Sequence, residues 1–110
     1  MTIFEKIIQR EIPADIVFED EKCIAFRDIH PMAPVHILVV PKKVIASVDA
    51  LTPEDSNLVG HLFLAIQKIA KEQGLANGYR VITNIGPDAG QTVDHLHFHL
   101  LGGKRMSDNL

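Results

Sequence analysis

Three histidines alternate with apolar residues in the segment from His95 to Leu101, whose sequence is HLHFHLL. Successive side chains of a β-strand point to opposite faces, so this segment as a strand presents three imidazoles on one face and apolar groups on the other. Imidazole changes charge near neutral pH and serves as a nucleophile, acid, base or metal ligand. The segment therefore predicts a row of reactive groups mounted on a buried strand.

Two chemistries fit this row of histidines. A His-x-His pair on one strand can hold a zinc ion, and a third histidine completes an open catalytic zinc site. In nucleophilic catalysis, one imidazole attacks an electrophile while its neighbours position the substrate and the leaving group. We favour nucleophilic catalysis, because Asp94 points to the other face of the strand and leaves a zinc site without a carboxylate base. The zinc site remains the alternative.

A loop with two glycines precedes the histidines, over residues 84–93. It lacks the Lys-Ser/Thr pair of a Walker loop and the GxGxxG pattern of a dinucleotide site. Taken alone, it is an ordinary connection between strands. Beside the histidines, Gly90, Gln91 and Thr92 would offer backbone and side-chain donors to a phosphate oxygen.

Two further positions have both a structural and a functional interpretation. Asp28 follows a strand, where aspartate is common in turns. It is also placed to accept ribose hydroxyls, with Phe26 and Ile29 on either side of a base. His36 opens an otherwise apolar strand, where it is either a hydrogen-bonded core residue or a support for the other histidines.

We expect structural roles for the remaining reactive side chains. Cys23 is the only cysteine, which excludes an internal disulfide. It lies within a strand pattern and has no adjacent base, which predicts a buried and inert thiol. His61, at the edge of a helical apolar stripe, and His30, before a proline, are expected to be structural or exposed.

The elements that position these residues follow from caps, periodicity and breakers. A capping box of Thr2 and Glu5 starts a short helix over residues 3–10. A second amphipathic helix starts at Thr52-Pro53 and ends at Gly74. Strands are predicted over residues 16–19, 23–27, 36–40, 79–83 and 95–101. About five strands and two helices, mostly joined by hairpins, predict an α+β fold with an antiparallel sheet.

Composition sets the class of protein. A chain of 110 residues forms one domain over residues 1–110. The net charge of −3 provides no basic field for nucleic acid. The first residues have no signal-peptide pattern, and no apolar run is long enough to span a bilayer. We expect a soluble cytoplasmic protein that binds neither nucleic acid nor membranes.

The chain resembles the histidine triad family, whose pattern is His-φ-His-φ-His-φ-φ with φ apolar. Residues 95–101 match that pattern at every position. Further segments look like the nucleotide-binding branch, which contains proteins similar to adenosine phosphoramidases. These segments lie at residues 3–8, 12–14, 25–29, 33–36, 41–43, 78–80 and 90–93.

The resemblance implies a homodimer in which two five-stranded sheets, each with two helices, merge into one ten-stranded sheet. It implies a hydrolase for purine nucleoside monophosphates, such as AMP, that carry an amine or acyl group on phosphorus. The resemblance implies no cofactor and no metal. The alternative function is a non-catalytic nucleotide-binding regulatory module, and a less favoured one is a zinc-dependent hydrolase.

The resemblance also assigns roles to residues. His97 would be the nucleophile and form a nucleotidyl-histidine that water hydrolyses. His99 would contact the phosphate and the departing group, the backbone at His95 would orient the nucleophile, and His36 would lie behind the triad. The nucleotide would also contact Ile7, Phe26, Asp28, Ile29, Asn84, Gly90, Gln91 and Thr92.

Overall fold

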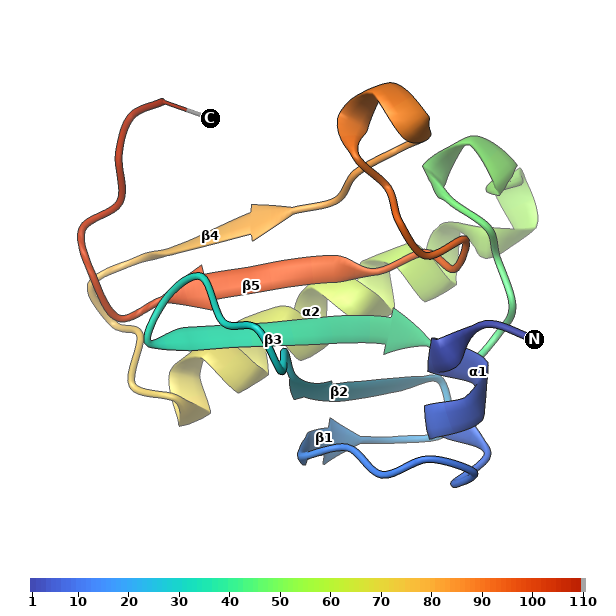
Figure 1. The fold of residues 1–110 in the computed structure, drawn as a ribbon, viewed down its shortest axis with the longest axis horizontal. Helices are drawn as coiled ribbons and strands as arrows, with labels where there is room; N and C mark the ends of the chain where they lie inside the picture. The colour runs from blue at the N-terminus through green and yellow to red at the C-terminus, as the bar shows by residue number, and fades with distance from the viewer. Residues whose placement is uncertain (110) are drawn as a thin grey trace.

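A computed structural model describes residues 1–109 and contains a five-stranded antiparallel sheet with strand order β1-β2-β3-β5-β4 (Figure 1). The regular elements are α1 (Ile3–Ile8), β1 (Ile16–Glu19), β2 (Cys23–Arg27), β3 (Val35–Pro41), α2 (Ser56–Glu72), β4 (Tyr79–Ile82) and β5 (Phe98–Gly102). Three short 3-10 turns are η1 (Val48–Ala50), η2 (Pro53–Asp55) and η3 (Pro87–Ala89). These elements confirm the predicted α+β fold. Within residues 1–109, no helix is both long and apolar enough to cross a bilayer.

The two helices cover opposite faces of the sheet, with α1 on the near side and α2 behind in Figure 1. On the α2 face, alternate residues of the central strands join the larger apolar core, including Ile37, Val39, Phe98 and Leu100. The opposite residues of the same strands turn toward α1. This face carries a smaller apolar cluster composed of Phe4, Ile7, Ile24, Phe26, Leu38 and Val40.

The short helix α1 begins as the capping box predicts. The Thr2 hydroxyl accepts a hydrogen bond from the Glu5 amide, and the Glu5 carboxylate accepts one from the Thr2 amide. The helix ends at Ile8, before the predicted residue 10, because Arg10 adopts a left-handed conformation with φ of 62°. Buried Phe4 and Ile7 then anchor α1 on the sheet.

The second helix also starts near its predicted cap. Thr52 and Asp55 form a capping box around Pro53, but the first turn is the 3-10 turn η2, and α2 follows from Ser56. Gln73 is the C-cap, and Gly74 follows it with φ of 75°, a conformation that glycine adopts without steric cost.

The last strand differs from its prediction over residues 95–101. It pairs with β3 from Phe98 onward and with β4 from His99 onward, so the residues before Phe98 have no strand partner. The Leu96 amide instead donates to the carbonyl of Ile45 at 2.6 Å. The alternation persists without the pairing, because Leu96, like Phe98 and Leu100, is buried against α2.

Candidate active site

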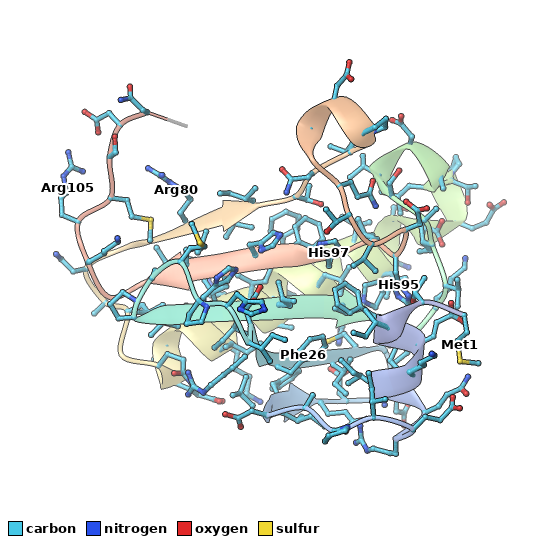
Figure 2. The ribbon with its side chains drawn as sticks, in the orientation of Figure 1. Met1, Phe26, Arg80, His95, His97 and Arg105 are labelled. Atoms are coloured by element: carbon cyan, nitrogen blue, oxygen red, sulfur yellow. The ribbon has the colours of Figure 1, made fainter. Side chains whose placement is uncertain are left out.

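The structure brings His36, His95, His97 and His99 together on the α1 face of the sheet, where Figure 2 labels His95 and His97. His36 comes from β3, His99 from β5, and the other two from the extended segment before β5. His36, His95 and His97 are buried, and His99 is half-buried. The predicted face of imidazoles is therefore present, and β3 extends it with a fourth ring.

The hydrogen bond between His97 and the backbone of His95 determines which nitrogen of His97 is free. Nδ1 of His97 lies 2.7 Å from the carbonyl oxygen of His95. A carbonyl only accepts, so Nδ1 carries the proton and Nε2 keeps its lone pair. No described residue hydrogen bonds to this Nε2, and it is not sealed from solvent. His97 thus presents an unprotonated nitrogen to the open face.

Two neighbours hold the His97 segment in place. The hydroxyl of Thr83 donates to the His97 carbonyl at 2.8 Å. The ring of Phe4 meets the imidazole of His97 edge to face, with centroids 4.9 Å apart. Burial lowers the pKa of His97, although the hydrogen bond to the His95 backbone opposes this effect in part, so the ring is neutral and nucleophilic at pH 7.

His95 is oriented from both sides of its ring. Nε2 donates to the carbonyl of Pro41 at 2.8 Å, which leaves Nδ1 as an acceptor. The hydroxyl of Thr2 lies 3.5 Å from that Nδ1, so the N-cap of α1 also contacts the histidine site. Because the carbonyl of His95 holds His97, the end of β3 and the start of α1 both influence the position of His97.

A chain of two hydrogen bonds assigns the protons of His36 and His99. The Met32 amide donates to Nδ1 of His36 at 3.0 Å, so the proton of a neutral His36 ring is on Nε2. This Nε2 lies 2.9 Å from Nδ1 of His99 and donates to it. A neutral His99 therefore carries its proton on Nε2.

His36 and His99 are both held in the neutral form. Burial lowers the pKa of His36, and the Asp28 carboxylate, whose Oδ2 lies 3.5 Å from Nε2, opposes this effect only in part. Burial, then the neighbouring rings of His97 and His36, lower the pKa of His99 to about 4. The site thus combines one free nitrogen on His97 with one N–H on His99, in rings whose centroids are 5.1 Å apart.

The hydrogen bonds also bear on whether this site holds a metal. Asp28, His36 and His99 each offer a ligand atom within 4.8 Å of the other two. A metal at that point needs a lone pair on Nε2 of His36, but the Met32 amide already occupies the lone pair of Nδ1. A proton on Nε2 satisfies these contacts, whereas a cation there conflicts with them.

The residues predicted to contact a base or ribose lie around the same face. Asp28 is half-buried, and its Oδ1 accepts the amide of His30 at 2.8 Å. Phe26 and Ile7 are buried in the small apolar cluster, whereas the side chain of Ile29 is 84% exposed. Ile29 therefore exposes an apolar side chain to solvent next to Asp28.

The residues predicted to contact phosphate lie on the loop between β4 and β5. The Gln91 side chain closes this loop, because its oxygen accepts from the Gly86 amide and its nitrogen donates to the carbonyls of Ala46 and Val93. The amides of Gly90 and Gln91 donate within the loop as well. Asn84 is half-buried, and Gly90 and Thr92 are exposed. The loop is thus rigidly held, and its contacts with a phosphate stay a prediction.

Sequence reasoning missed several residues that position the histidines. They are Thr2, Phe4, Met32, Pro41 and Thr83. Two of them act through backbone groups, which any residue type supplies, so no sequence signal marks them. Thr2 was visible as a helix cap, but its contact with His95 joins residues that are remote in the chain.

Known proteins are similar to this chain in both sequence and fold. A family model described as the HIT domain matches residues 9–106. An uncharacterised HIT-like protein of Synechococcus elongatus is 58% identical over 106 residues, which are 96% of this chain and 93% of the relative.

Solved structures agree with this match. A HIT family hydrolase from Clostridium thermocellum superposes with a TM-score of 0.96 at 47% identity, covering 99% of this chain and 96% of that one. A histidine triad nucleotide-binding protein from Candida albicans gives a TM-score of 0.83 at 32% identity, covering 100% of this chain and 86% of that one. The histidine row, the fold and these matches together establish that the chain belongs to the HIT domain family.

Proposed function

We propose that this protein hydrolyses purine nucleoside monophosphates that carry an amine or acyl group on phosphorus, through a nucleotidyl-His97 intermediate. The observation that carries this proposal is the 2.7 Å hydrogen bond between Nδ1 of His97 and the His95 carbonyl. It supplies what a nucleophilic imidazole needs, which is a fixed tautomer and an unprotonated nitrogen on the open face. Two structural relatives, one named a hydrolase and the other a nucleotide-binding protein, support the same class.

In the first step, Nε2 of His97 attacks phosphorus and the bond from phosphorus to the leaving amine breaks. The amine departs with a proton taken from Nε2 of His99. The anionic phosphate raises the pKa of His99 when it binds, so His99 enters this step as the imidazolium. Its Nδ1–H then donates to Nε2 of His36, whose own proton moves to Nδ1 as the contact with the Met32 amide opens. His97 becomes a nucleotidyl-imidazolium, and its Nδ1–H strengthens the bond to the His95 carbonyl.

In the second step, water attacks the same phosphorus from the side that the amine has left. His99, now neutral, takes the proton of the water, and the bond from phosphorus to His97 breaks. His97 leaves as neutral imidazole, and the products are the free amine and the nucleoside monophosphate. Division of the reaction into two displacements gives each one a good leaving group.

Substrate binding in this proposal uses the residues around the histidines. Asp28 accepts the ribose hydroxyls, and the base lies against Ile7, Phe26 and exposed Ile29, so binding covers apolar surface. Asn84, Gly90, Gln91 and Thr92 line the phosphate position, where Thr92 has an exposed hydroxyl. No metal or cofactor takes part in this scheme.

We include a cytoplasmic homodimer in the proposal. β4 lies at one edge of the sheet, so its outer side is open to a second β4, which would extend the sheet to ten strands. Phe63 and Leu64 on α2 and Tyr79 on β4 are exposed and apolar or aromatic. An interface there would bury them.

The test uses adenosine 5′-phosphoramidate as the substrate and compares His97→Ala with His30→Ala. His30 is exposed and gives a matched histidine control outside the hydrogen-bonded rings. We expect His97→Ala to lose activity and to retain AMP binding, whereas His30→Ala retains both. Rapid quench and mass spectrometry of the wild type should find AMP bonded to His97. Full activity of His97→Ala, or turnover without an adduct on His97, would refute the mechanism.

A further inference from the structure

A second group of potential ligands lies on the α2 face of the sheet, opposite the histidine site. It consists of Asp20 in the turn between β1 and β2, Cys23 at the start of β2, and His61 on α2. One ligand atom of each residue lies within 4.8 Å of those of the other two. Cys23 belongs to the core beneath α2, whereas the histidine site lies against α1. The two groups are therefore separated by the sheet.

The turn between β1 and β2 holds the Asp20 carboxylate at the partly exposed side of this group. Oδ1 of Asp20 accepts the amides of Lys22 and Cys23 at 2.8 and 2.9 Å, which fixes the carboxylate. Oδ2 then faces Nε2 of His61 at 2.6 Å. The side chains of His61 and Asp20 are 33% and 30% exposed, whereas Cys23 is fully buried. An ion therefore reaches the buried sulfur only when the contact between Asp20 and His61 opens.

We propose that Asp20, Cys23 and His61 form a binding site for a divalent cation of the zinc class. One sulfur, one imidazole nitrogen and one carboxylate oxygen are the donors that zinc and cobalt select, with water in the fourth position. Bonds of about 2.0–2.3 Å to a tetrahedral ion place ligand atoms about 3.5 Å apart. The pair of Asp20 and His61 must therefore open by about 1 Å, which the partly exposed ring of His61 can do by a small rotation while the carboxylate keeps its amide contacts.

The protonation states suit an exchange of protons for a cation. Burial raises the pKa of Asp20, but the amides of Lys22 and Cys23 and the ring of His61 outweigh it and bring the pKa to about 2. Burial, then Asp20, raise the pKa of Cys23 to about 12, against a smaller opposing effect of Lys42. The thiol is thus protonated at neutral pH, and a bound ion displaces this proton to solvent.

The imidazole of this group differs from that of His36 in the histidine site. In the contact with Asp20 the proton of His61 lies on Nε2, because a carboxylate only accepts. No described residue hydrogen bonds to Nδ1 of His61, so this proton can move to Nδ1 and leave the lone pair of Nε2 for an ion. In His36 the Met32 amide excludes that arrangement. Among the described residues, the group at Cys23 is therefore the one whose histidine can free its Nε2 lone pair for a metal.

The test uses Co²⁺ as a spectroscopic substitute for Zn²⁺, added to the reduced full-length protein. The chain has one cysteine, so a thiolate-to-cobalt charge-transfer band can only come from Cys23. We expect this band to saturate at one Co²⁺ per chain, to disappear when Zn²⁺ is added, and to accompany the release of one proton. His99→Asn, which removes one ligand of the other group, should leave the band unchanged.

Two variants separate a metal site from a bare reactive thiol. Asp20→Asn and His61→Gln change partly exposed side chains, and circular dichroism will verify that both fold. Each should weaken Co²⁺ binding more than tenfold, since even residues that only support a metal ligand are worth about that much. Absence of the band in the wild type, or unchanged affinity in both variants, would overturn the proposal. Hydrolysis is not measured, so neither outcome depends on the proposed function.

Discussion

Nε2 of His36 donates a hydrogen bond to Nδ1 of His99 across 2.9 Å, although 63 positions separate the two residues in the chain. The bond forms because His36 and His99 are diagonal neighbours on the antiparallel strands β3 and β5, where Leu38 lies opposite His99. The Met32 amide fixes the proton of His36, and His36 in turn fixes that of His99. A loop amide thus decides which nitrogen faces the leaving group.

Loss of the donor at His36 should slow the chemical step. We expect His36→Leu to reduce kcat by up to about a hundredfold, because His99 loses its fixed orientation, while KM changes little. His36→Gln places an N–H near the position of Nε2 and should recover part of kcat. Steady-state kinetics on adenosine 5′-phosphoramidate will measure both. Equal kcat values for the two variants, or a change in KM alone, would contradict this role.

The lowered pKa of His99 predicts how stability depends on pH. The folded pKa of about 4 lies below the ordinary value of 6.5, so the unfolded chain binds the proton more tightly between these values. This contribution to the free energy of unfolding is complete above pH 6.5 and is lost as the pH falls toward 4. The free energy of unfolding, measured with urea between pH 4 and 7, should therefore depend less steeply on pH in His99→Asn than in the wild type. Parallel curves would disprove the assignment.

Nucleotide binding should take up a proton. The AMP phosphate raises the pKa of His99 from about 4, so binding near pH 6 converts neutral His99 to the imidazolium. Titration calorimetry in buffers of different ionisation enthalpy will count the protons. Adenosine, which has no phosphate, is the control and should take up none. Equal proton uptake for AMP and adenosine would exclude His99 as the proton acceptor.

A charge on the exposed face of α2 should separate the proposed dimer. Leu64 is 66% exposed in the single chain, so Leu64→Glu costs the monomer little and buries a charge in the dimer interface. Val44→Glu is the matched control, since Val44 is 58% exposed in the loop after β3. Sedimentation velocity should find monomers for Leu64→Glu and dimers for the wild type and the control. A dimeric Leu64→Glu protein would place the interface elsewhere.

Local signals predicted the fold well. The capping box at Thr2 and the hairpin strands over residues 16–19 and 23–27 depend on contacts between near neighbours, and the structure has them where the sequence indicates. The start of β5 depends on where β3 and β4 end, which no local pattern reveals. The strand was therefore predicted to begin at residue 95, although its pairing begins at Phe98.

The histidine site was predictable in its residues and less so in its contacts. Alternation places His95, His97 and His99 on one face, because side-chain direction is a local property. The Met32 amide and the Pro41 carbonyl escaped prediction, since backbone groups leave no mark in the sequence. Cys23 is buried as expected, and a histidine remote from it in the sequence lies near it. His61 reaches it from α2 through folding alone.

The position of β5 in the sheet has a consequence for biosynthesis. β5 is the last strand along the described chain, yet it lies between β3 and β4, which leave the ribosome before it. Until β5 emerges, the nascent protein displays the apolar edge of β3, a template on which another chain can add a strand. Insertion of the HLHFHLL segment assembles the histidine site and removes this hazard in one event.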